Sequence, residues 1–354
     1  MKLPFRRTDI GSRLGTGILA VSLLLIVVGI GAGFAAQAPL MLNGAGATFP
    51  YPIYSKWFDE YHKLHPNIQI NYQSIGSGGG IRQLAEGTVD FGASDGPMTD
   101  AQLAQAKVKP LHFPTVLGAD VAIYNIPGVT AELKFTPEAL AGIFLGKITK
   151  WNHPALAKAN PGVNLPAKDV VVIHRSDGSG TTYIWTDYLS KVSPEWQSRV
   201  GRNTSVNWPV GLGGKGNEGV SGLVRQTPNS IGYVELTYAI QTRLAYGLVR
   251  NSSGNFVKAD LAGVTAAAAS AAQAIPDDFR VSITNPSGKD AYPISSFTWL
   301  LIPAKIQDAA KRKALVDFLG WMLSEGQKYA QPLSYAPLPK EVAGKVKATI
   351  AQVR

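Results

Sequence analysis

The chain has 354 residues, 45% of them hydrophobic, and it contains no cysteine. This length and composition allow a sizeable buried core and two domains of ordinary size, and they exclude a disordered chain. The absence of cysteine excludes a disulfide framework, a thiolate metal site, a cysteine nucleophile and a lipoprotein attachment point. The five His residues lack the spacing of a metal motif, so we expect neither a metal nor a cofactor.

The formal net charge of +10 is distributed rather than concentrated. The first 38 residues carry +3, and the Lys and Arg residues of the remainder are spread along the chain. The one cluster, Lys311-Arg312-Lys313, falls on the polar face of a predicted amphipathic helix and indicates a solvated surface. We therefore expect no nucleic-acid partner, and a basic background that favours the collection of small anions.

Residues 1–38 combine a basic start with an apolar run from 14 to 34 and a small-residue end. This pattern predicts an export signal, so the rest of the chain is expected to fold outside the cytoplasm, as a periplasmic or outer-surface protein. The apolar run is longer than a usual signal core, and Pro39 is unfavourable directly after a cleavage site. Both cleavage, for example after Ala35, and retention as an inner-membrane anchor therefore remain open.

From residue 40 onward, predicted strands and helices alternate, which favours an α/β architecture. A strand over 40–43 leads into the Gly-rich turn 44–50, which contains Thr48 and Phe49 and precedes a helix. The apolar face of that helix is expected to consist of Ile53, Trp57, Tyr61 and Leu64. A Gly-rich turn at a helix start is suited to binding an anion.

The same design recurs in the next unit of the chain. Residues 68–73 alternate as a strand, 75–80 form a turn that includes Ser77, and 81–86 predict a short helix. A further strand over 89–94 ends at Asp95. A carboxylate is therefore placed where the other turns place hydrogen-bond donors.

The middle of the chain begins with a strand over 115–124, which we interpret as leaving a first lobe. Residues 137–144 predict a helix, with Thr136 as its cap and Pro137 in its first turn. Residues 146–168 are rich in Pro and Asn, and we expect an irregular surface excursion there.

The most informative stretch is residues 175–182, Arg-Ser-Asp-Gly-Ser-Gly-Thr-Thr. It follows a buried strand over 170–173 and precedes a helix, and ligands of open α/β sheets bind at such turns. Arg175 can present a planar fork of donors to an oxyanion, and Asp177 can hold that fork in place. Ser179, Gly180 and Thr181 supply hydroxyl and backbone donors. Taken alone, the stretch is equally compatible with a solvated turn that caps a helix.

Later segments complete the α/β pattern. The Gly-rich stretch 211–217 is superficially similar to a phosphate loop but has no Ser or Thr after its Lys, so we expect no nucleotide there. Strands are predicted over 231–235 and 298–302, and a helix over 265–274. A last helix is expected to bury Ala310, Ala314, Leu315, Phe318, Leu319 and Met322.

Several of these stretches closely resemble the family of periplasmic phosphate-binding proteins (PstS) of the high-affinity ABC phosphate uptake system. The matching motifs, which together extend over nearly everything after residue 40, are 44–50 (GAGATFP), 75–80 (IGSGGG), 89–95 (VDFGASD), 175–181 (RSDGSGT), 208–217 (WPVGLGGKGN) and 231–235 (IGYVE).

The resemblance implies a two-lobed α/β periplasmic binding protein fold with two interdomain crossovers and a ligand cleft. Lobe I would comprise 39–115 plus 291–354, and lobe II 116–290. The protein would bind inorganic phosphate by hinge closure and deliver it to the membrane permease subunits and their cytoplasmic ATPase, and we expect it to act as a monomer. The phosphate contacts implied by matching positions are Thr48, Phe49, Ser77, Asp95, Arg175, Ser179, Gly180 and Thr181, with Asp177 as a supporting residue.

Two other classes of function remain as alternatives. A secreted phosphoesterase would need an activating base or a metal set, and no His residue falls in a recognisable motif; His174, beside Arg175 on the strand, is expected to point to the opposite face. We therefore do not expect an enzyme. A receptor for another oxyanion such as sulfate or molybdate, or a surface sensor without transport, also fits the donor turns.

Overall fold

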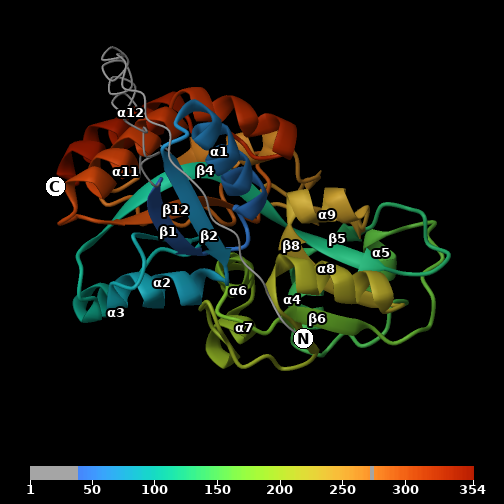
Figure 1. Ribbon diagram of the computed structural model, residues 1–354. Helices are drawn as coiled ribbons and strands as arrows, with labels where there is room; N and C mark the ends of the chain where they lie inside the picture. Colours follow the sequence, from blue (N-terminus) through green and yellow to red (C-terminus); the bar gives the residue numbers. More distant parts are fainter. Residues whose placement is uncertain (1–38, 272–274) are drawn as a thin grey trace, which may run out of the picture. The chain divides into compact units, whose positions relative to one another are not determined.

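A computed structural model describes residues 39–271 and 275–354 (Figure 1). The strands are β1 (Leu40–Gly46), β2 (Ile68–Ser74), β3 (Phe91–Ser94), β4 (Pro110–Asn125), β5 (Lys134–Phe135), β6 (Val171–Arg175), β7 (Leu212–Gly214), β8 (Ser230–Glu235), β9 (Ala245–Tyr246), β10 (Leu248–Arg250), β11 (Phe256–Val257) and β12 (Ser295–Pro303).

The helices are α1 (Tyr51–Leu64), α2 (Ser77–Glu86), α3 (Asp100–Gln105), α4 (Pro137–Phe144), α5 (Pro154–Ala159), α6 (Gly180–Val192), α7 (Pro194–Arg199), α8 (Gly216–Gln226), α9 (Leu236–Thr242), α10 (Leu261–Ala271), α11 (Ala309–Met322) and α12 (Lys340–Thr349). Short 3-10 helices follow α11 and α12: η2 (Glu325–Tyr329), η3 (Gln331–Leu333) and η4 (Ile350–Gln352).

One large sheet has the strand order β2-β1-β3-β12-β4-β8-β6-β7, with β9 paired to β4. Within it β1 is parallel to β2 and β3, and β6 is parallel to β7 and β8, whereas β12 and β8 run antiparallel to β4. A second, small sheet has the order β11-β10-β5. The parallel strands of each group end where helices begin, which places the predicted turns at the carboxyl ends of strands.

Strand β4 joins the two groups of strands. Its residues 110–119 pair with β12, and its residues 120–125 pair with β8. The strand begins at Pro110, five residues earlier than the predicted strand over 115–124, although proline is disfavoured inside a sheet and both Pro110 and Pro114 lie in this added part. The register with β12 shifts opposite Pro114, between Thr298 and Trp299, and this irregularity accommodates a residue that has no N–H to donate.

Helices cover both faces of the first group of strands (Figure 1). Helices α1 and α11 lie on one face and α2 on the other, and Phe58 of α1 packs on Tyr72 of β2, Phe91 of β3 and Phe318 of α11. The predicted apolar face of α1 is buried except at Leu64, which is 61% exposed. Leu64 is the last residue of the helix, where the chain turns away from the sheet.

Three predicted elements differ in the structure. Helix α2 starts at Ser77, so the glycines that we assigned to a turn form its first turn. Residues 154–159 form helix α5 inside the stretch predicted to be irregular, because Pro154 suits the first helical position and the His153 side chain caps it. The Gly-rich stretch 211–217 leads into α8, in a segment where the sequence analysis had assigned neither a helix nor a strand.

The predicted helix over 265–274 corresponds to α10, and its last three positions lie outside the described residues, as does the predicted export signal in residues 1–38. Among the helices that the structure does describe, none has the length and apolar character required to cross a bilayer.

Candidate functional site

The starts of α2 and α6 face each other at close range. The N–H of Gly78 donates to the carbonyl of Gly178 at 2.8 Å, so the two turns are in backbone contact. A Cβ on Gly180 would lie 2.4 Å from both the Asp95 Oδ2 and the Ser77 Oγ atoms. The glycines in these turns are therefore required by the close approach of two backbones and a carboxylate.

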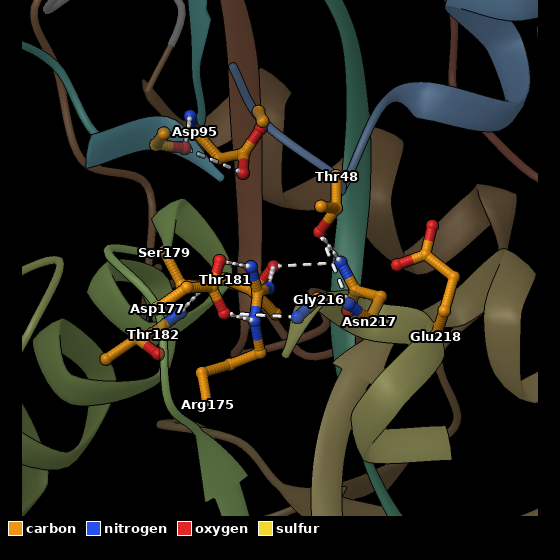
Figure 2. A network of polar contacts seen from close by, with 12 residues as sticks. Thr48, Asp95, Arg175, Asp177, Ser179, Thr181, Thr182, Gly216, Asn217 and Glu218 are labelled. Carbon is orange, nitrogen blue, oxygen red and sulfur yellow. Dashed lines mark hydrogen bonds and ion pairs between the residues drawn. The ribbon is translucent and has the colours of Figure 1, made fainter. Parts of the chain in front are cut away.

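Arg175 is buried at the end of β6 and is oriented by its neighbours (Figure 2). Its Nε and Nη2 atoms donate to the two carboxylate oxygens of Asp177 at 2.8 and 2.6 Å, and Nη1 donates to the Thr181 Oγ1 atom at 3.2 Å. The ion pair holds the pKa of Asp177 below its usual value against the opposing effect of burial. A guanidinium has five N–H groups, so two remain to bind an oxyanion.

Asn217, at the start of α8, connects the two sides of the site (Figure 2). Its Nδ2 atom donates to Thr48 Oγ1 at 2.7 Å and to Thr181 Oγ1 at 3.2 Å, and its backbone N–H also donates to Thr48 Oγ1 at 3.3 Å. Its Oδ1 atom accepts from the N–H of Glu235 at 3.0 Å, which fixes the amide orientation. Our sequence analysis did not select Asn217.

The two threonine hydroxyls are thereby set as donors. Thr48 Oγ1 accepts twice from Asn217, and Thr181 Oγ1 accepts from Asn217 and from Arg175. A hydroxyl oxygen has two lone pairs, so each remaining O–H must donate to another acceptor. Both side chains are buried, which makes an unmet donor costly and an added oxyanion favourable.

Buried backbone donors complete the arrangement. Ser179 caps α6 by accepting from the N–H of Thr182 at 3.0 Å. In residues 39–271 and 275–354, the N–H groups of Gly180, Thr181 and Ser77 make no hydrogen bond. Because native proteins pair nearly all buried N–H groups, these three indicate an anion at the two helix starts.

Asp95 is buried beside these donors. Its Oδ1 atom accepts from the Thr298 hydroxyl at 2.7 Å and its Oδ2 atom from the Ser77 hydroxyl at 3.4 Å. Burial raises the pKa of Asp95 to about 7, although these hydroxyls and the Arg175 guanidinium oppose the shift. The proton equilibrium of Asp95 is therefore shifted from the acidic range towards neutral pH, where its carboxyl group can exchange a proton with a bound anion.

Two further buried carboxyl groups, Asp120 and Glu235, lie opposite each other where β4 pairs with β8. Burial raises the pKa of both well above the usual value, and neighbouring carboxylates add to the shift. Glu235 accepts from the N–H of Thr237 at 2.8 Å, whereas neither carboxylate oxygen of Asp120 has a hydrogen-bond partner within the described residues. The raised pKa values favour the neutral form of both groups, which reduces their repulsion of an anion nearby.

Phe49 adjoins Thr48 at the site, but its side chain belongs to the hydrophobic core. Its ring is fully buried and packs on Tyr335, whose hydroxyl donates to the Phe49 carbonyl at 2.6 Å. The hydroxyl of Tyr238 similarly donates to the Thr48 carbonyl at 2.6 Å. These bonds fix the turn before α1, and only the backbone of Phe49 is available to a ligand.

The structure thus brings together the residues that the sequence selected, namely Thr48, Phe49, Ser77, Asp95, Arg175, Asp177, Ser179, Gly180 and Thr181. Sequence reasoning missed Asn217 and Thr298, although the Gly-rich turn before Asn217 was a usable signal because it also precedes a helix. His174 packs on Trp208 with ring centroids 4.8 Å apart, away from this site. Within the described part of the chain, His, Asp and Glu side chains form no group that could hold a metal ion.

Comparison with known proteins agrees with this geometry. Residues 34–326 match a family model described as a PBP superfamily domain. The phosphate-binding protein PstS of Pasteurella multocida is 48% identical over 308 residues, which cover 87% of this chain and 89% of the relative.

Two solved structures share the fold at lower identity. A phosphate-binding protein from Stenotrophomonas maltophilia superposes with a TM-score of 0.68 at 18% identity, over 87% of this chain and 93% of that one. An ABC-type phosphate transport receptor from Vibrio cholerae superposes with a TM-score of 0.54 at 18% identity, over 84% of this chain and 100% of that one. The two-lobed α/β binding-protein fold predicted from the sequence is confirmed, and the chain belongs to the PstS family of phosphate-binding proteins.

Proposed function

We propose that the protein is a receptor that binds inorganic phosphate, one ion per chain, at the site between α2, α6 and α8. The observation that carries this proposal is the set of buried donors without partners, which includes the N–H groups of Ser77, Gly180 and Thr181 and the outer edge of the Arg175 fork. A tetrahedral oxyanion offers enough lone pairs to satisfy all of them. An enzyme would need an activated nucleophile, whereas the Asp95 carboxylate contacts the Ser77 hydroxyl only at a long 3.4 Å and forms its short bond with Thr298, inside strand β12.

Asp95 would discriminate between oxyanions. A carboxylate only accepts hydrogen bonds, so it stabilises an anion that still carries a proton and repels one that has none. Phosphate near neutral pH retains a proton, whereas sulfate does not. Asp95 in its ionised form would therefore favour phosphate over sulfate and related ions.

We further propose that the ligand-binding residues belong to two lobes, 39–115 plus 291–354 and 116–290. Direct contacts support a closed arrangement, since Gly78 bonds Gly178 at 2.8 Å and Thr48 bonds Asn217 at 2.7 Å, in each case across the proposed boundary. Strand β4 and the segment near residue 290 would act as the hinge. Small-angle scattering should show a smaller radius of gyration with phosphate, and an unchanged radius together with unchanged hydrogen exchange at both hinge segments would contradict closure.

The receptor is proposed to act outside the cytoplasm and to deliver phosphate to the permease of an ABC transporter. The basic and apolar character of residues 1–38 and the transport role in the name of the Vibrio cholerae relative support this assignment. The chain would act as a monomer. Cell fractionation that places the full-length chain in the cytoplasm would exclude the extracytoplasmic role.

Calorimetric titration tests the binding function. We expect one phosphate per chain and at least a hundredfold preference over sulfate, which corresponds to roughly 2.7 kcal/mol. Absence of phosphate binding, or equal affinity for sulfate, would refute the proposal. Turnover of a chromogenic phosphate ester that is lost with Arg175→Ala would instead favour an enzyme.

A further inference from the structure

A second cavity lies away from the phosphate site, at the start of β4 and the end of β12. It has a volume of about 1000 Å3 and is walled by residues of 107–111, 304–307 and 352–354 together with Arg312 of α11. Five cationic side chains surround it, which define what we call the basic basin: Lys107, Lys109, Lys305, Arg312 and Arg354. No aspartate or glutamate side chain lines it, and the α-carboxylate of Arg354, the last residue of the printed sequence, accepts from the N–H of Ile306 at its edge.

Within the described residues, no ion pair neutralises the cationic side chains of the basic basin. Throughout residues 39–271 and 275–354, none of the five forms an ion pair, whereas Lys311 pairs with Asp90 and Lys313 with Asp317, on either side of Arg312. The segments outside that range contain a single acidic residue, Asp9. The sequence predicted that Lys311, Arg312 and Lys313 form one solvated face, but the structure separates Arg312, which is half-buried, from its paired neighbours.

The backbone holds these side chains together. The N–H of Ala304 donates to the Lys109 carbonyl at 2.8 Å, the N–H of Arg354 donates to the Ala304 carbonyl at 2.9 Å, and the N–H of Ile306 donates to the α-carboxylate of Arg354 at 2.7 Å. The N–H of Lys107 donates to the carbonyl of Ala85 at 2.8 Å. The backbone therefore holds the like charges close together before any ligand binds. A bound polyanion would remove their mutual repulsion without a further cost for ordering these segments.

The floor of the basin is apolar. Val108, Leu111 and Ile306 are partly buried and pack on the hydrophobic core, and their remaining surface lines the cavity. An adjoining cavity of about 520 Å3 shares Lys107, Lys109 and Leu111 with the basin. Its far side is acidic at Asp277 and Asp278, so a polyanion is expected to stay in the basin itself. An occupant therefore meets cations at the rim and aliphatic carbon beneath.

The basin is independent of the phosphate site. Pro303 lies five residues beyond Thr298, the partner of Asp95, along β12. At about 3.3 Å per strand residue, the two regions are roughly 17 Å apart. No residue of the phosphate site lines the basin, so occupation of one site leaves the direct contacts of the other in place.

We propose that the basic basin is a second ligand site, for an organic polyphosphate of nucleotide size. One orthophosphate would leave most of the five cations unmatched, whereas several linked phosphate groups can contact them together. The volume lies in the usual range for sites that enclose small molecules, and the apolar floor accommodates an organic group. A concave wall favours such a molecule over a flat lipid surface. This proposal does not depend on the function of the other site.

Calorimetric titration with ATP, with inorganic tripolyphosphate as the comparison, tests the proposal on the full chain in stoichiometric orthophosphate without a divalent metal. We expect one ATP per chain, bound more tightly than tripolyphosphate because the base and ribose cover the apolar floor. Arg312→Glu and Lys305→Glu should each weaken ATP binding about tenfold or more, which is roughly 1.4 kcal/mol. The affinity should fall as salt is added.

Lys313→Glu is the matched control, because it makes the same change in net charge next to Arg312 on a residue that is paired with Asp317 and is 77% exposed. It should change ATP affinity by less than about threefold, or about 0.65 kcal/mol. Absence of ATP binding, tripolyphosphate binding as tight as ATP, or equal weakening by Lys313→Glu would each overturn the proposal. Retention on phosphatidylglycerol vesicles that is lost with Lys305→Glu would also overturn it in favour of a membrane surface.

Discussion

The two walls of the phosphate site are built on different principles. The wall at the start of α2 consists almost entirely of backbone, and an added Cβ on Gly80 would lie 2.5 Å from the Ala45 carbonyl oxygen. The wall at the starts of α6 and α8 carries the charges and amides, with the Arg175–Asp177 pair and the Asn217 side chain at its centre. The first wall provides close approach, and the second provides the favourable charge.

This difference predicts which kind of substitution weakens phosphate binding at each wall. A wall made of backbone is sensitive to added volume, because overpacking costs about 1–3 kcal/mol. A wall made of charges is sensitive to lost groups, because a desolvated contact has no water to replace it. Substitutions in the charged wall should therefore change affinity most, while Asp95, the one carboxylate of the α2 side that contacts the site, should change selectivity.

Arg175→Ala should have the largest effect. It removes the outer pair of guanidinium donors and leaves the buried carboxylate of Asp177 without its ion-pair partner. Truncating one side of a buried charge pair costs about 2–5 kcal/mol, so phosphate affinity should fall roughly thirtyfold or more. Calorimetry measures this loss. Binding within a factor of about three of the parent protein would show that Arg175 does not contact the ligand.

Asn217→Asp should have the next largest effect. The introduced carboxylate is close in size but accepts hydrogen bonds, so the hydroxyls of Thr48 and Thr181 would turn towards it and away from the anion. We expect a loss of about 1–3 kcal/mol in phosphate binding near neutral pH. Lowering the pH protonates the introduced carboxyl group, which then becomes a donor. The loss of phosphate affinity relative to the parent protein should therefore be smaller at low pH.

Asn125→Asp is the control for Asn217→Asp. The Nδ2 atom of Asn125 donates to the carbonyls of Val224 and Arg225, at the far end of the same helix α8. Asn125→Asp should leave the phosphate affinity nearly unchanged at every pH. If Asn217→Asp weakens binding equally at low and neutral pH, orientation of the hydroxyls is not the cause.

Asp95 should control selectivity more than affinity. Its pKa is raised to about 7 by burial, so the carboxyl group is increasingly protonated as pH falls below that value and can then donate to sulfate. The ratio of phosphate to sulfate affinity should fall about tenfold between about pH 8.5 and about pH 5.5. Competition titrations measure this ratio. Asp95→Asn should give a low ratio at both pH values, chiefly because sulfate improves, and a ratio equal to that of the parent protein would exclude the filter.

The sequence predicted those elements and site residues whose pattern lies within a few neighbouring residues. The cap of α4 at Thr136 and the strand, turn and helix around Arg175 could be identified from neighbouring residues, and the structure agrees. The helical start of α2 could not, because glycine disfavours helix in isolation and contacts with Gly178 and the Ala45 carbonyl override that preference.

Long-range contacts explain the part of the site that the sequence missed. Asn217 acts through a hydroxyl 169 residues earlier, and Thr298 through a carboxylate 203 residues earlier. Neither pairing leaves a pattern in a local window of sequence. The predicted residues were recognisable because each lies in a turn with its own composition, whereas Thr298 lies inside an ordinary apolar strand.

Asp120→Asn should have the smallest effect, on stability alone. Both carboxylate oxygens of Asp120 are buried without a partner, and burial raises its pKa well above the usual value. The folded protein therefore holds a proton that the unfolded chain releases, so the contribution of Asp120 is fully present below about pH 3.9 and is lost as pH rises towards the folded pKa.

Asparagine is neutral at every pH, so Asp120→Asn should unfold at a higher temperature than the parent protein near neutral pH. A gain of about 1 kcal/mol corresponds to a few degrees. The difference in unfolding temperature should vanish near pH 4. Asp169→Asn is the control of opposite sign. The Lys150 side chain lowers the pKa of the exposed Asp169 carboxyl, so its removal should slightly destabilise the protein at neutral pH. A difference between Asp120→Asn and the parent protein that does not depend on pH would show that Asp120 stays in one protonation state on folding and unfolding.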